Sequence, residues 1–147
     1  MTDDGSLDYL AERTLAVDLF NHVWTLLDTA DRTPEQDAEM LEAALASRQH
    51  WERPGGAEQW AIGEWQISRV YSVLGDGPSA HAHAQQCLEL SLRDGVDDFV
   101  EASAHEALAR ALAVCGDMDG ARRERDLAYA LAVNLEDDDD RAVVESD

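Results

Sequence analysis

The sequence predicts an all-α protein made of stacked antiparallel helical hairpins, with about six to seven helices. Ala is the commonest residue and long β-branched runs are missing, a composition that favours helix. Breaker residues divide the chain into segments of helical length, and the short loops between them place successive helices antiparallel. The 147 residues suffice for one domain. We therefore expect a single domain over residues 1–147, with residues 1–5 and 136–147 frayed.

Capping residues and breakers set the expected bounds of each helix. Thr33 precedes Pro34, which fits a first helical turn, and Gln36 completes a capping box with Thr33. Pro54 lies in a double breaker that ends this second helix, and Pro78 starts the fourth. In order, the helices are expected over residues 7–30, 34–53, 57–74, 78–93, 98–116 and 119–135. The acidic run 137–140 either caps a short last helix over residues 141–145 or frays.

An internal repeat joins the second half of the chain into two equivalent hairpins. Residues 70–76 return as residues 111–117, an offset of 41 residues. Gly75 and Gly116 fall where a helix must end, at positions that favour a positive φ. Small residues follow each glycine five and twelve positions later, so that the second helix of each hairpin can pack closely on the first. These residues are Ala80 and Cys87 in one copy and Ala121 and Ala128 in the other.

With Ser68 and Ala109 added as small residues of the first helices, this pattern resembles the tetratricopeptide-repeat family over residues 57–135. The resemblance implies a right-handed superhelix of hairpins, whose first helices line a concave groove that holds extended peptides. Two features depart from the family. The 41-residue period is longer than usual, and Ala84 and Arg125 replace the aromatic residue of the second helix. The first third of the chain fits the pattern only loosely.

Charge excludes several classes of partner. The chain has 32 acidic and 11 basic residues, with no Lys, for a formal charge of −21. Such a surface repels nucleic acid and anionic membranes. The acidity indicates either a docking surface for a basic partner or a halophilic adaptation, and its even spread along the chain favours the second. No apolar run approaches the roughly 18 residues of a membrane span. The N-terminus lacks the layout of a signal peptide, so a cytoplasmic location is expected.

Catalytic and metal-binding signatures are scarce. The chain has no phosphate-binding glycine loop, no GxSxG and no HExxH. Cys87 and Cys115 are interpreted as small core residues, and no CxxC spacing exists for zinc. His81 and His83 are two apart on a helix and point to nearly opposite sides, which indicates a solvated face. We predict no catalytic residue, no metal ligand and no cofactor, and a non-enzyme is favoured over an enzyme.

Tryptophan and arginine gather around the third helix and suggest a binding face. Trp and Arg supply much of the binding energy where they cluster at interfaces. The resemblance places Trp65 and Arg69, with their equivalents Glu106 and Arg110, in the groove. The two arginines either hold a carboxylate of a partner or pair with this chain's own Glu64 and Glu106. The predicted binding residues are Arg48, His50, Trp51, Trp65, Arg69, Glu106 and Arg110.

Three functions compete on these observations. The leading hypothesis is a non-enzymatic module that binds a protein or peptide through the face of the third and fifth helices. An alternative is a small-molecule or metal-binding protein, or an enzyme, that uses a pocket of His22, Glu64 and His105, which recur on successive first helices. A third is a homodimerising scaffold in which the aromatic patch is the interface.

Overall fold

The computed structural model describes residues 3–135, with side chains described from residue 8 onward. This part of the chain contains six α-helices and no strand, which confirms the predicted fold class. The helices are α1 (Asp3–Leu27), α2 (Pro34–His50), α3 (Ala57–Val73), α4 (Gly77–Ser91), α5 (Asp98–Val114) and α6 (Met118–Ala132). The predicted short helix over residues 141–145 lies outside the described residues.

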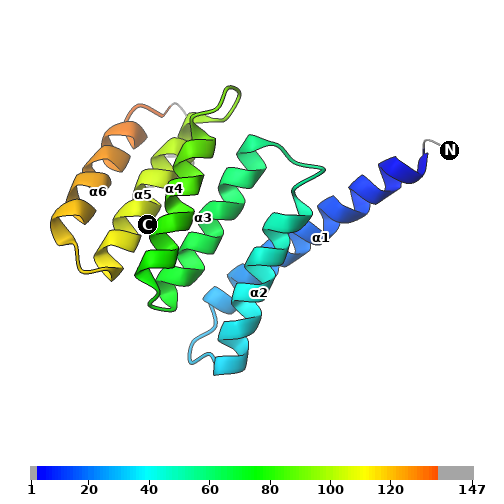
Figure 1. Ribbon diagram of the computed structural model, residues 1–147, viewed down its shortest axis with the longest axis horizontal. Coiled ribbons are helices and arrows are strands. Elements are labelled where there is room, and N and C mark those ends of the chain that lie inside the picture. The colour runs from blue at the N-terminus through cyan, green and yellow to red at the C-terminus, as the bar shows by residue number, and fades with distance from the viewer. Residues whose placement is uncertain (1–2, 136–147) are drawn as a thin grey trace.

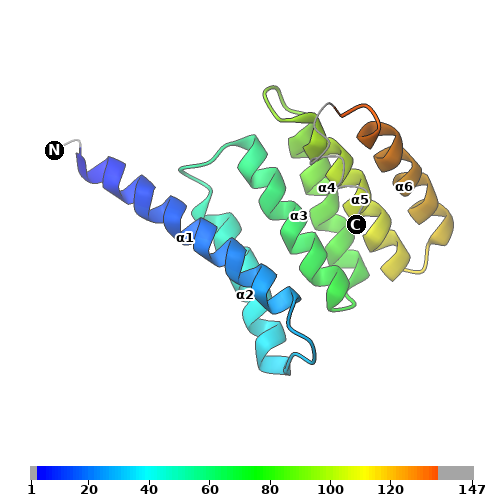
Figure 2. The same ribbon diagram turned by 180° about the vertical axis from the view of Figure 1, so that it is seen from behind.

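The helices stack as three consecutive hairpins. The pairs α1–α2, α3–α4 and α5–α6 pack together, α2 contacts α3, and α4 contacts α5. The two first helices α3 and α5 also contact each other. Figure 1 shows the hairpins following one another in chain order, and Figure 2 shows the N-terminal part of α1 extending beyond its hairpin. This packing is compatible with a helical repeat fold.

Local capping explains where α1 and α2 meet. The Thr33 side chain accepts the Gln36 amide and the Gln36 side chain accepts the Thr33 amide, so the predicted capping box is confirmed. Helix α1 begins at Asp3, so the expected start at residue 7 is wrong, and it ends at Leu27, three residues before the expected residue 30. Arg32 contacts this end of the helix. Its guanidinium donates to the carbonyls of Leu26, Leu27 and Thr29, which lie at the helix end and just beyond it.

The 41-residue repeat holds in three dimensions. Helices α3 and α5 each have 17 residues, α4 and α6 each have 15, and every bound of one hairpin lies 41 residues before its equivalent. Gly75 and Gly116 adopt φ values of 83° and 88°, as predicted. After each glycine, the amide of Asp76 or Asp117 donates back to Tyr71 or Leu112, which closes the helix end in the same way.

The core lies in layers between successive helices. Val23, Met40 and Ile67 pack between α1, α2 and α3. Cys87 is buried with Val100 between α4 and α5, as expected of a small core residue. The same expectation is wrong for Cys115, which is exposed because it is the C-terminal cap of α5. The small residues predicted to bring each second helix against its first are all buried, and they are Ala80, Cys87, Ala121 and Ala128.

Candidate functional site

Contacts divide the predicted binding residues into two groups. One group lies on the first helices of the hairpins, where α3 carries Trp65 and Arg69 and α5 carries Glu106 and Arg110. The other group lies at the end of α2 and comprises Arg48, His50 and Trp51. Phe20 of α1 lies between parts of the two groups, because it packs against Trp24 beside Trp65 and also lines a hollow with Trp51.

Aromatic rings and an arginine meet where α1 faces α3. The ring centroids of Trp24 and Trp65 are 5.6 Å apart, and the Arg69 guanidinium lies 5.5 Å from the centroid of Trp24. Phe20 packs edge-on against Trp24 at 6.1 Å. Sequence reasoning missed Trp24, although a signal existed. Trp24 lies 41 residues before Trp65, the same offset that relates the later hairpins.

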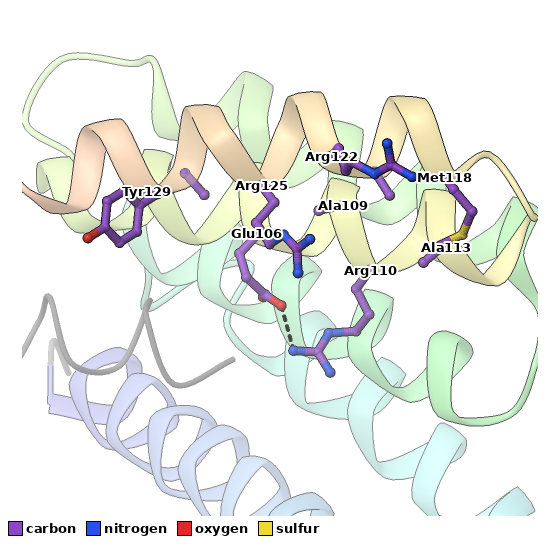
Figure 3. A pocket seen from close by; sticks show the side chains of 10 residues that line it. Glu106, Ala109, Arg110, Ala113, Met118, Arg122, Arg125 and Tyr129 are labelled. Atoms are coloured by element: carbon purple, nitrogen blue, oxygen red, sulfur yellow. Dashed lines mark hydrogen bonds and ion pairs between the residues drawn. The ribbon is translucent and has the colours of Figure 1, made fainter.

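A pocket of about 310 Å³ opens between α5 and α6 (Figure 3). Glu106 and Arg110 belong to its α5 wall, and the Arg110 Nη2 atom donates to Glu106 Oε1 over 2.5 Å. Arg110 therefore pairs with this chain's own carboxylate, which was one of the two expected arrangements. We call this hollow the Arg pocket. Its lining residues are Glu106, Ala109, Arg110, Ala113, Met118, Ala121, Arg122, Arg125, Ala128 and Tyr129.

The Arg pocket has an alanine floor and a positively charged edge. Ala121 and Ala128 on the floor are buried, whereas Arg122 and Arg125 at the edge are exposed. Arg122 lies 3.7 Å from Asp119, an exposed pair that contributes little to stability. Arg125 makes no hydrogen bond or ion pair with another residue between 8 and 135. The sequence offered Arg125 only as a departure from the repeat pattern, and it held no sign of Arg122 or Tyr129.

Among the described residues that line the Arg pocket, three carry a guanidinium group and one, Glu106, carries a carboxylate. This local excess of positive charge occurs in a chain of formal charge −21. A guanidinium presents planar, forked donors that match a carboxylate, and it stays charged at any physiological pH. The arrangement can therefore hold an anionic group at the edge while apolar atoms of the same ligand rest on the alanines.

The group at the end of α2 has different partners. The Arg48 Nη1 atom donates to Glu52 over 2.8 Å, and the Arg48 guanidinium lies over the Trp60 ring. His50 Nδ1 lies 2.7 Å from Glu12 of α1. Trp51 lines a smaller hollow of about 140 Å³, together with Val17, Phe20, Gln59, Ile62 and Gly63. These contacts tie α1, α2 and α3 together.

The residues of the alternative pocket, His22, Glu64 and His105, each pair with a different neighbour. His22 is exposed and lies 3.6 Å from Glu39. Glu64 lies 3.2 Å from His83, and His105 lies 2.6 Å from Glu124. The reason is register. At the true offset of 41 residues, the equivalent of Glu64 is the fully buried Val23, so His22 points elsewhere. Within residues 8–135, no three His, Cys, Asp or Glu side chains are placed to hold a metal ion.

His83 also corrects an expectation, because it does not lie on a purely solvated face. Its ring stacks on Tyr71 at 5.5 Å and contacts the buried Glu64, which lies 3.7 Å from Arg48 as well. Glu64 is equivalent to His105, and His83 is equivalent to Glu124. The two hairpins therefore place an acid–imidazole pair at the same two positions, with acid and base exchanged.

No helix in the described part of the chain has both the length and the apolar character that crossing a bilayer requires. Comparison of the chain with protein families, with curated proteins and with solved structures found no match.

Proposed function

We propose that the chain is a non-enzymatic interaction module that binds a protein or peptide segment on the face of its first helices, with the Arg pocket as the main contact. The observation that carries this proposal is that Arg110, Arg122 and Arg125 all line an alanine-floored hollow of about 310 Å³. A ligand with one carboxylate and a small apolar group meets both parts of that lining.

The repeat supports the proposal. We infer that the hairpins are of the tetratricopeptide kind, because each has a Gly-Asp turn with a positive φ at the glycine and buried small residues five and twelve positions later. In that arrangement successive first helices line one groove. Arg69 and Arg110 occupy equivalent positions on α3 and α5, which contact each other, so a bound segment can run from one helix to the next.

Exposed apolar residues beside the Arg pocket favour a segment of protein over a small enclosed metabolite. Met118 and Tyr129 line the pocket, yet 53% and 61% of their surfaces are exposed. A ligand that reaches the pocket therefore continues across a surface that can bind its neighbouring residues. Tyr is among the residues that contribute most where partners bury it.

Selection of random twelve-residue peptides displayed on phage, with the full chain as bait, tests this function. We expect enriched peptides that carry Asp or Glu and whose dissociation constants rise about tenfold or more in Arg125→Gln. Arg123→Gln is the matched control, since Arg123 is exposed on the same helix but does not line the pocket. A lack of enrichment, or peptides that bind both variants equally, would rule out the Arg pocket as the binding site. If the chain dimerises and the enriched peptides do not disrupt the dimer, the homodimerising scaffold is the better explanation.

A further inference from the structure

The Arg pocket occupies the place in the last hairpin that a whole helix fills in the hairpin before it. Its residues Glu106, Arg125 and Tyr129 are the 41-residue equivalents of Trp65, Ala84 and Leu88. In the earlier hairpin these equivalents pack against Ala107 and Leu108 of α5. The pocket residue Ala128 corresponds to Cys87, which packs against Val100 and Ala104 of α5.

The approach of α5 to the earlier hairpin is close along its whole length. At the far end, Gly77 is the equivalent of the pocket residue Met118. A Cβ added to Gly77 would come within 2.5 Å of Cys115 Sγ and 3.1 Å of the Cys115 amide nitrogen. Met118 has the side chain that Gly77 lacks, so a helix in the Arg pocket rests on the part lined by Glu106, Arg125, Ala128 and Tyr129 and cannot approach the Met118 end as closely as α5 approaches Gly77.

We propose that the Arg pocket is the docking seat for an acidic amphipathic α-helix of a partner protein. This inference rests on the proposed function and specifies its partner. The apolar residues of that helix follow the pattern by which α5 fills the earlier seat. Val100, Ala104, Ala107 and Leu108 are spaced as i, i+4, i+7 and i+8, a single helical stripe of small and medium side chains.

The residues that differ between the Arg pocket and the equivalent surface of α3 and α4 indicate why the partner is acidic. Ala84 is replaced by Arg125 and His81 by Arg122, so that a guanidinium faces the position where α5 places Ala107. An alanine there would bury the charge of Arg125 without a counterion, at a cost in desolvation. A carboxylate at the same position of the docked helix pairs with that charge.

A peptide derived from α5 provides the probe. It has the sequence of residues 98–114 with capped ends and carries Ala107→Glu and Ala111→Glu, which place two carboxylates one turn apart on the face that enters the seat. The control isomer carries Ala102→Glu and Ala109→Glu instead. These positions have the same charge but lie on the opposite side of the helix, where Ala102 packs towards α6. Fluorescence anisotropy with the full chain gives the dissociation constants, and NMR shifts of the labelled peptide report its bound conformation.

We expect the first peptide to bind as a helix about tenfold more tightly than its isomer. Arg125→Gln should weaken it about tenfold, while Arg123→Gln should change the dissociation constant less than about twofold. Equal binding of the two isomers, or an extended bound peptide, would overturn the proposal. If no helix binds while phage-selected peptides still require Arg125, the interaction function stands and only the helical partner is wrong.

A last variant tests whether the Arg pocket binds a partner helix or the chain's own acidic segment. Residues 136–140 are all acidic and lie outside the described part of the chain. The full-length variant Asp138→Asn with Asp139→Asn and Asp140→Asn removes three of these charges. We expect the peptide to bind it with an affinity close to that of the parent. Binding about tenfold tighter would assign the seat to the chain's own acidic segment and would overturn the proposal of a partner helix.

Discussion

At the scale of single residues, substitution of Gly75 or Gly116 by alanine tests the energetic cost of a positive φ without a contribution from steric clashes. Both have a positive φ, and a Cβ added to either would meet no atom within 4 Å. We predict that Gly75→Ala and Gly116→Ala each lower the free energy of unfolding by about 1 kcal/mol, because only the left-handed conformation opposes the methyl group. Urea unfolding at equilibrium measures the change.

A control accompanies these substitutions. Gly75→Asn and Gly116→Asn should cost less than the alanine variants, since Asn tolerates the left-handed region. Alanine variants at positions 75 and 116 that are as stable as the parent would show that the glycines do not carry the turn.

Cys87 links burial to a dependence on pH. Burial of the thiol, with the Glu64 carboxylate as a smaller influence, raises the pKa of Cys87 from 9.0 to about 12. Between those values the folded protein keeps the proton that the unfolded chain loses. The contribution of Cys87 to stability is therefore complete below pH 9 and declines as the pH rises towards 12, by up to about 1.4 kcal/mol per pH unit.

Unfolding curves at pH 8, 9 and 10 check this expectation against Cys87→Ala. The variant should lose stability less steeply over this range, because the remaining titrating groups are common to both proteins. Parallel pH profiles would contradict it. Thiol labelling provides a second measurement. Cys115 is exposed and should react in the native state, whereas Cys87 should react only after unfolding.

At the scale of elements, the exchanged acid–imidazole pairs connect the two helices of each hairpin. His105 and Glu124 join α5 to α6 over 2.6 Å and are mostly shielded from solvent. We predict that His105→Glu lowers the free energy of unfolding by about 1–3 kcal/mol, because two carboxylates then share one site. Adding Glu124→His to that variant should recover most of the loss, since Glu64 and His83 already use this arrangement in the neighbouring hairpin.

A double-mutant cycle over the two positions gives the coupling free energy directly. The exposed pair of His22 and Glu39, 3.6 Å apart, is the matched control and should show little coupling. A double variant no more stable than His105→Glu alone would mean that the surroundings, rather than the pairing, fix which residue stands at each position.

Elements also show what the sequence could predict. The starts and ends of α3 to α6 fall within three residues of expectation, because glycines, prolines and capping side chains act locally. The end of α1 also lies three residues from its expected position, and there Arg32, which follows the helix, folds back onto its carbonyls. The repeat offset correctly made Arg69 and Arg110 equivalent. It could not reveal the Arg pocket, since that hollow depends on the distance between α5 and α6 and on side chains from both.

At the scale of the whole molecule, the formal charge of −21 predicts a stability that depends on salt. Carboxylates repel one another most strongly when few ions screen them, and the screening length falls from about 30 Å at 0.01 M salt to about 3 Å at 1 M. We predict that the melting temperature rises as sodium chloride increases over this range. Calorimetric scans at several salt concentrations measure it. A melting temperature that stays constant or falls would exclude the halophilic adaptation.

The exchange of acid and base between the hairpins also bears on how the chain avoids assembling in the wrong order. Because the two hairpins have identical helix lengths, their helices can pair incorrectly during folding, so that α3 packs against α6 and α5 packs against α4. This exchanged pairing would set Glu64 against Glu124 and His105 against His83, two carboxylates in one place and two imidazoles in the other. Only the correct order gives each acid its base. The two acid–imidazole pairs therefore favour the native pairing of α3 with α4 and of α5 with α6 over the exchanged pairing.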